Sequence, residues 1–350
     1  MKKMALFTML LSGLMVIQFL FGMNVALAQG KTHFLWRHDK NINAGIPRMI
    51  SAKIPPCLSI DPGDTVMFAA RMGEDEQVLP ESATDVPTGK ELRGIDFDRI
   101  HPITGPVFIR GAKPGDILQV EVLDIVPGPF GITWIDPNWG FLVKEFDDYY
   151  KHTFVLNYPR EEYVEYGWGF RLKLEPMCGI AAVAPPPGIE KRTLYPAEWG
   201  GNMDNKDFKR GTTWYFPVFN DGALFSTGDC HATQGDGEVG LAGLECPANI
   251  LLRFDVIKGR KIPEPQYETE TFYATTGTGA TMEDAGRKAL KYMLDFLVWK
   301  FGIPRHEAYM LCSLKGDLRV SEVVDPAIQM HFEFPKDAYV KGTVPKMYGK

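Results

Sequence analysis

The chain has 350 residues, of which 45% are hydrophobic and 23% are charged, a composition typical of a soluble globular protein with a full-sized core. Its formal net charge of −6 argues against a nucleic acid partner, because such partners select clustered Lys and Arg. No basic run interleaved with aromatic residues occurs in the sequence. We therefore expect no nucleic acid partner.

The N-terminus has the pattern of a secretory signal peptide. Two lysines precede an uncharged apolar run over residues 4–25, and the small residues Ala26 and Ala28 follow it. Cleavage after Ala28 would make Gln29 the first residue of an exported protein, periplasmic or secreted, with no stable membrane anchor. A retained anchor is the alternative, because the apolar run is nearly long enough to span a bilayer.

Short strands separated by turns are predicted for most of the remaining chain. The turns Pro62-Gly63 and Pro114-Gly115 each precede a run of apolar and β-branched residues. The predicted strands cover residues 65–69, 117–122, 154–156, 169–174, 213–219, 250–256 and 268–273. With 35 Gly and 26 Pro between them, these strands predict a mainly β protein with a β-sandwich, jelly-roll-like body.

One strong helix is predicted late in the chain. Thr281 is a suitable N-cap, and Glu283 and Asp284 favour the positive end of the helix dipole. Residues 285–301 then carry apolar side chains at helical spacing, and Gly302 ends the helix.

A shorter helix from Pro304 to about Cys312 and a strand over residues 318–324 follow. The predicted organisation is one domain over residues 29–335 with an α+β portion at about 275–335. Residues 336–350 are predicted to form a frayed tail.

The five cysteines give no signal for a structural zinc knuckle, because no C-x-x-C pair occurs. We expect them to be small buried hydrophobic residues, although one disulfide is possible. They are Cys57, Cys178, Cys230, Cys246 and Cys312.

Residues 228–238 carry the densest group of chemically active side chains. If a strand ends here, Asp229 and His231 point to the same side with Cα atoms about 6.6 Å apart, which suits two ligands of one cation. Cys230 would point to the opposite side, into the core. Asp236 and Glu238 repeat the same spacing. The alternative is an exposed acidic loop in which His231 only caps a turn.

Two other segments supply further candidates. Gly201, Asn202 and Asp204 form a glycine-rich segment in which Asp204 is a third predicted ligand. Asn202 either supports a ligand from behind or faces the substrate, unless the segment is only an Asx turn. His101 is a candidate to donate to a carbonyl or complete the metal shell, or is a turn residue without chemistry. Glu245 is a candidate buried partner that orients His231.

These segments together resemble the acetamidase/formamidase family. The matching segments are residues 101–107, 111–116, 200–204, 228–239 and 323–326. The resemblance implies a β-sandwich with an α+β elaboration, a homo-oligomer, and hydrolysis of a short amide to ammonia and a carboxylate. The signal peptide and the Trp- and Tyr-rich residues 133–139 and 161–168 depart from the family pattern. If these Trp- and Tyr-rich residues line the pocket, formamide or acetamide is the wrong substrate.

The resulting hypothesis is a metal-dependent amidase. Asp229, His231 and Asp204 would hold a divalent metal, zinc being favoured and calcium or magnesium compatible. Glu238, or else Asp236, would move the proton in catalysis, and His101, Asn202 and Gly201 would contact the substrate.

Two rival functions stay open: a metal-containing β-sandwich that binds carbohydrate, and a metal-dependent hydrolase or lyase with a non-amide substrate. A serine mechanism of the α/β-hydrolase type is not supported, because no G-x-S-x-G motif occurs.

Overall fold

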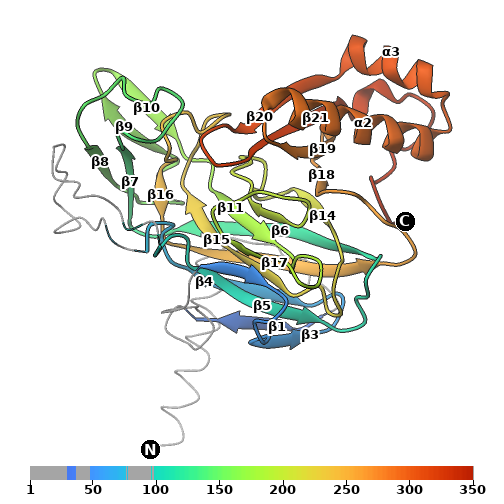
Figure 1. Cartoon of the computed structure of the whole chain (residues 1–350), viewed down its shortest axis with the longest axis horizontal. Coiled ribbons are helices and arrows are strands. Elements are labelled where there is room, and N and C mark those ends of the chain that lie inside the picture. The colour runs from blue at the N-terminus through green and yellow to red at the C-terminus, as the bar shows by residue number, and fades with distance from the viewer. Residues whose placement is uncertain (1–29, 37–47, 76, 78–95, 97, 350) are drawn as a thin grey trace, which may run out of the picture.

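The computed structural model describes residues 30–36, 48–75, 77, 96 and 98–349. The predicted signal peptide, residues 1–28, lies outside the described residues. Two large sheets make up most of the molecule, and two helices cover one end of it (Figure 1). Within the described residues, no helix combines the length and the apolarity that crossing a membrane requires.

The larger sheet has nine strands, which are mostly antiparallel. Their spatial order is β1 (Thr32–Leu35), β4 (Thr65–Ala70), β17 (Ala248–Ile257), β6 (Ile117–Pro127), β14 (Thr213–Pro217), β18 (Gln266–Glu268), β19 (Phe272–Gly279), β21 (Ile328–Pro335) and β20 (Asp317–Glu322).

The second sheet has eight strands. Six follow the order β13 (Gly200–Asn202), β11 (Met177–Ala182), β15 (Phe225–His231), β16 (Glu245–Cys246), β7 (Phe130–Ile135) and β8 (Tyr150–Val155). β5 (Ile103–Ile109) also pairs with β15, and β3 (Leu58–Ile60) pairs with β5. Two separate ribbons are β9 (Tyr163–Gly167) with β10 (Phe170–Lys173), and β2 (Met49–Ser51) with β12 (Glu190–Arg192).

An apolar core joins the two large sheets into a sandwich. The ring of Phe225 on β15 packs edge-on against Phe68 on β4 and Phe254 on β17, at centroid distances of 6.2 and 5.2 Å. All three side chains are fully buried, and edge-to-face packing is the arrangement that aromatic rings favour. The mainly β fold class predicted from the sequence is confirmed.

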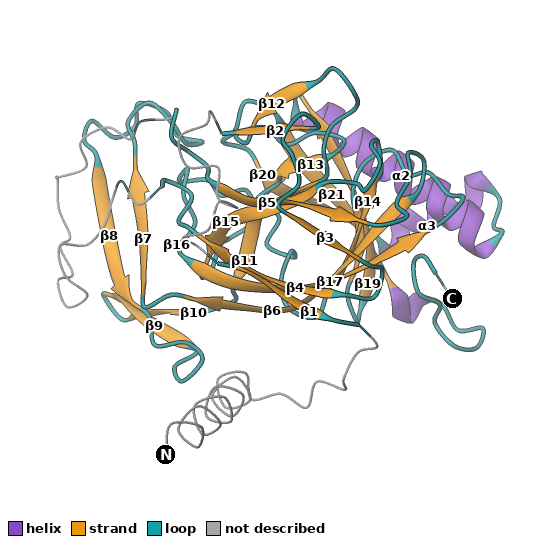
Figure 2. Ribbon diagram, turned by 90° about the horizontal axis from the view of Figure 1, so that it is seen from below, coloured by secondary structure: helices purple, strands orange, loops and turns teal. Residues whose placement is uncertain are grey.

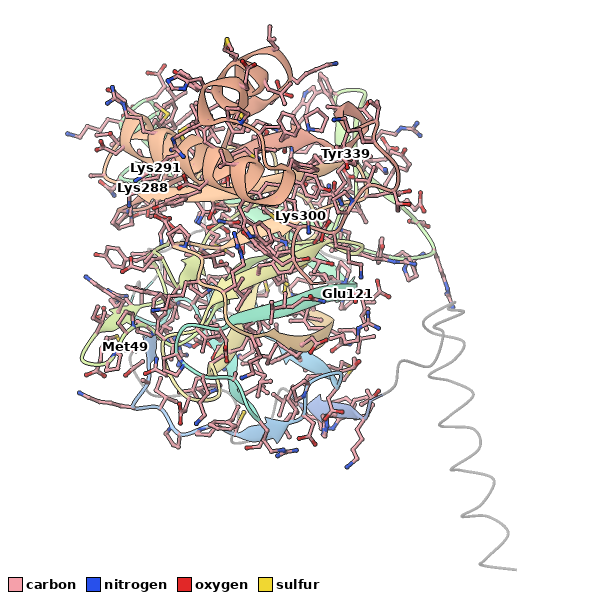
Figure 3. The ribbon with its side chains drawn as sticks, turned by 90° about the vertical axis from the view of Figure 1, so that its right-hand side faces the viewer. Met49, Glu121, Lys288, Lys291, Lys300 and Tyr339 are labelled. Carbon is pink, nitrogen blue, oxygen red and sulfur yellow. The ribbon has the colours of Figure 1, made fainter. Side chains whose placement is uncertain are left out.

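The helical pair lies where the sequence predicted it. α2 (Met282–Phe301) begins after Thr281, whose side chain accepts from the Asp284 amide, and ends at Gly302 in the left-handed conformation. α3 (Arg305–Lys315) follows Pro304 and runs three residues past the predicted end. Both helices lie on the side of β19 and β21, away from β7 and β8 (Figure 2). Figure 3 views this side, with Lys288, Lys291 and Lys300 labelled along α2.

Two predictions about this end of the chain are wrong. Residues 268–273 do not form one strand, because a turn held by the Thr269 hydroxyl separates β18 from β19. The predicted frayed tail is wrong for its described part, residues 336–349, because Met347 and Tyr348 are 0% and 1% exposed. Both pack into the helix-side core, and the Met347 amide donates to Glu268.

All five cysteines are free thiols. Cys178, Cys230 and Cys246 are register partners across β11, β15 and β16, and all three are buried in the sandwich core. The predicted role of Cys230 as a core residue is therefore confirmed.

Candidate active site

β15 presents Asp229 and His231 on the face opposite to Cys230. Nε2 of His231 lies 3.7 Å from Oδ1 of Asp229, so the two side chains converge as their spacing predicted. On the neighbouring strand β16, Glu245 is the register partner of His231, and its Oε1 lies 3.1 Å from the same Nε2. Nε2 also lies 3.9 Å from Oδ1 of Asp204, which follows β13. Three carboxylates thus surround one imidazole nitrogen.

A narrow cavity lies beside this group. It offers about 30 Å³, which is room for roughly two water-sized groups. Its polar lining comes from strand ends of both sheets and consists of Glu74, His101, Asn202, Asp204, Asp229, His231, Glu238, Glu245 and Asp325. No Lys or Arg of the described part of the chain lines it. Six carboxyl groups therefore share a small space with no basic side chain except histidine.

Several oxygen atoms of this cavity are buried without a hydrogen-bond partner. They include both carboxylate oxygens of Glu74, Oδ1 of Asp204 and Oδ1 of Asp229. Nearly all buried polar atoms in proteins are paired, and an unpaired buried carboxylate is costly. Two overlapping trios, Asp204–His231–Glu238 and Asp229–His231–Glu245, place ligand atoms close enough to hold one cation. The donor set therefore fits a divalent metal.

The pKa shifts of these side chains have the same cause, the crowding of buried carboxyl groups. Burial and the negative charge of Asp229 raise the pKa of Asp204 well above its ordinary value, and burial and Asp204 do the same to the pKa of Glu238. Burial opposes a charge on His231, yet Glu245 and Asp229 together raise the pKa of His231 well above its ordinary value. Excess negative charge is thus the dominant property of the cavity.

The backbone bends to bring three of the acids together. Asp204, Asp229 and Glu238 have φ values of 40°, 54° and 46°, in the left-handed region that residues other than glycine seldom adopt. Each such residue costs about 1–3 kcal/mol, and such outliers gather at functional sites. The strain favours a functional role for these three side chains.

Gln234 fixes the orientation of His231. Its Oε1 lies 2.7 Å from Nδ1 of His231, and its side-chain amide donates to the carbonyl of Asp204 at 2.6 Å. If Nδ1 carries the proton and donates to Gln234, Nε2 is left unprotonated toward the three carboxylates, which is the form that binds metals.

The cavity brings together seven of the nine candidates that the sequence predicted. These are His101, Asn202, Asp204, Asp229, His231, Glu238 and Glu245. Gly201 does not line the cavity, and its backbone pairs with Ala181 on β11. Glu245 contacts His231 at Nε2, beside the other carboxylates, and so belongs to the possible ligands.

Asp236 does not reach the cavity. It binds Lys206 at 3.0 Å and the Nε of Arg319 at 3.0 Å on the outside of the loop. These two cations lower the pKa of Asp236 against the effect of its partial burial. The structure therefore contradicts the alternative assignment of Asp236 as the catalytic acid–base residue. Gly237 has a φ of 91° and turns the loop so that Glu238 alone faces inward.

Sequence reasoning missed Glu74, Asp325 and Gln234. Glu74 follows β4 of the opposite sheet, and Asp325 lies between β20 and β21, where it accepts from Nδ2 of Asn202 at 2.6 Å. Only the fold brings these segments to β15. The segment 323–326 was noted as a matching motif, which was the one available signal for Asp325.

A second group of the same residue types has different properties. Asp207, His331 and Glu333 also lie close together, but Asp207 accepts from Tyr267 and Glu333 accepts from Arg319 at 2.8 Å. Nδ1 of His331 lies 2.9 Å from the Ser321 hydroxyl. The polar atoms of this group already have hydrogen-bond partners and a cation beside them. We therefore interpret the group as part of the packing of β21.

Glycines leave room for the acidic cluster. A Cβ atom on Gly179 of β11 would overlap Oδ1 of Asp204 and lie 2.8 Å from Oδ2 of Asp229. A Cβ atom on Gly243 would lie 2.5 Å from Nδ1 of His231. The side chains of Asp204, Asp229 and His231 thus occupy space that any other residue at these two positions would fill.

We predict that Gly179→Ala displaces Asp204 and Asp229 and lowers kcat at least about 100-fold, because small displacements of reacting groups are costly. Gly235→Ala is the matched control, since a Cβ atom there would meet nothing within 4 Å. It should keep activity within about twofold. Steady-state kinetics and circular dichroism of both variants check this. Full activity in a folded Gly179→Ala protein would contradict the assignment of the site.

Comparison with known proteins gives independent information on this site. The chain is 29% identical over 268 residues to an acetamidase from Mycolicibacterium smegmatis, an alignment that covers 59% of this chain and 64% of that protein. The alignments span less than two thirds of the length of the curated relatives.

Solved structures match over more of their length. An acetamidase from Bacillus halodurans has 35% identity and a TM-score of 0.77, covering 83% of this chain and 95% of that one. An acetamidase from Yersinia enterocolitica has 28% identity and a TM-score of 0.80, covering 90% and 95%. The model of the Acetamidase/Formamidase family matches residues 48–191 and 187–340, which include the whole polar lining of the cavity. The chain belongs to the Acetamidase/Formamidase family.

Proposed function

We propose that this protein is a metal-dependent amidase that hydrolyses a primary amide to ammonia and a carboxylate. The observation that carries the proposal is the group of unpaired buried carboxylate oxygens around Nε2 of His231 in a narrow cavity. The family and the relatives named acetamidase and formamidase support amide hydrolysis.

The proposed metal ligands are Asp204, Asp229 and His231, joined by Glu245. A cation there would neutralise part of the negative charge and give the unpaired oxygens a partner. Zinc is favoured, because the proposed ligands include the imidazole of His231, while calcium and magnesium prefer oxygen ligands alone. When bound, such a cation polarises a carbonyl group and makes water a better nucleophile at neutral pH.

Glu238 is the proposed proton carrier. Its Oε1 accepts from the Gly243 amide at 2.8 Å, which holds the carboxylate at the cavity wall. In the reaction it takes a proton from the attacking water as the C–O bond forms. It then returns the proton to the amide nitrogen as the C–N bond breaks, so that ammonia leaves. Asn202, held by Asp325, and His101 are the proposed contacts of the amide group, because both line the cavity.

We predict that Glu238→Gln lowers kcat by about 10²–10⁴-fold, because the variant cannot carry a proton. Asp236→Asn lies two residues away on the same loop and should change kcat by less than about threefold, since Asp236 only binds Lys206 and Arg319. Ammonia release under saturating substrate compares the two. Equal losses in both variants would remove Glu238 from its proposed role.

Metal removal tests the cofactor. The purified protein should contain a divalent metal and release ammonia from primary amides, and a chelator should lower this activity at least about 100-fold. Zinc, calcium and magnesium are then added back separately. The ion that restores the rate of ammonia release is the metal that the enzyme uses.

Variants localise the metal. Asp229→Asn should lower the metal content, whereas Glu333→Gln in the satisfied group on β21 should leave it unchanged. A metal-free protein with undiminished activity would refute metal dependence while leaving the amidase proposal intact. Saccharide binding without ammonia release from any amide would favour a binding module.

Export and self-association are also part of the proposal. Mass analysis of the extracytoplasmic protein should give a chain that begins at Gln29. A chain that retains residues 1–28 would instead support a membrane anchor. A homo-oligomer is what the resemblance implies.

A further inference from the structure

Part of the cavity lining is apolar. The acidic residues Glu74, Asp204, Asp229, Glu238 and Glu245 are at most 7% exposed. The apolar lining consists of Ile100, Trp134, Trp139, Leu194 and Leu241. Trp134, Trp139 and Leu241 are partly exposed, so they reach both the cavity and solvent. Two indole rings therefore connect the cavity with the molecular surface.

Main-chain bonds hold this wall against the catalytic loop. Trp134 lies on β7 and packs on Met72 and Ile132. The Trp139 amide donates to the Asp136 carbonyl at 3.1 Å, and the Phe141 amide donates to the Val239 carbonyl at 2.9 Å. The segment that carries Trp139 is thus bonded to the residue next to Glu238. The indole wall and the proton carrier form one connected structure.

We propose that the substrate is a primary amide whose acyl group carries a flat, apolar substituent, such as an aryl or arylmethyl group. This inference rests on the proposed amidase function. The enclosed space of about 30 Å³ holds little more than the amide group, so any substituent lies toward the opening, along Trp134 and Trp139. Aromatic rings stack favourably on indoles, and burial of both surfaces stabilises the complex. Formamide and acetamide leave most of this wall in contact with water.

An unpaired donor at the wall is available to the amide group. Nε1 of Trp134 is buried and has no acceptor among the described residues. A buried indole N–H is ordinarily paired, so a bound carbonyl oxygen would supply the missing acceptor. Every primary amide has such an oxygen, and in the proposed substrate the acyl substituent then lies beside the same indole ring.

The test compares kcat/KM of the unmodified protein for formamide, acetamide, benzamide and phenylacetamide by ammonia release. We expect phenylacetamide or benzamide to exceed acetamide at least about tenfold, the discrimination that apolar pockets reach. Preference for formamide or acetamide overturns this inference and leaves the amidase proposal standing. Hydrolysis of none of the four overturns both.

Variants assign the preference to the wall. Trp139→Ala, or Trp139→Leu if the first does not fold, should lower the ratio of kcat/KM for phenylacetamide to that for acetamide at least about fivefold. Trp134→Phe keeps a ring and removes the N–H, and should lower kcat/KM for phenylacetamide. Trp168→Ala is the matched control, because Trp168 is 79% exposed between β9 and β10 and does not line the cavity. An unchanged ratio in the folded Trp139 variant would overturn the role of the wall.

Discussion

The placement of six carboxyl groups around one small cavity is the constraint on which the rest of the site depends. In water each of these groups would be solvated separately, but in a cavity of about 30 Å³ they repel one another, and oxygens of Glu74, Asp204 and Asp229 lack partners. The two sheets, the space left by Gly179 and Gly243, and three residues in the left-handed backbone conformation hold the carboxyl groups there. The proposed cation would offset this buried negative charge.

The alternation of side chains along β15 connects stability with chemistry. Cys230 packs in the sandwich core, while its neighbours Asp229 and His231 face the cavity. The register of β15 with β16 puts Glu245 beside His231 and Cys246 beside Cys230. A shift of one residue would exchange these faces and place charges in the core, so the pairing that holds the sheet also orients the proposed metal ligands.

Sequence patterns predicted those features that depend on residues close together in the chain. Thr281 and Gly302 mark the ends of α2, and the spacing of Asp229 and His231 predicted their convergence. Segments that meet only through the fold were not predictable from one sequence. Glu74 and Asp325 come from distant strand ends, and the ion pairs of Asp236 involve lysine and arginine from other elements. The buried C-terminus was missed because its few apolar residues have no periodic pattern.

The position of Asp325 between β20 and β21 has a consequence for biosynthesis. This residue lines the cavity and holds Asn202, which lies 123 residues earlier in the chain. A ribosome must therefore synthesise the chain through Asp325 before the pocket can close. Chains that stop before Asp325 lack one wall of the site, so assembly of the pocket is tied to synthesis of this late segment.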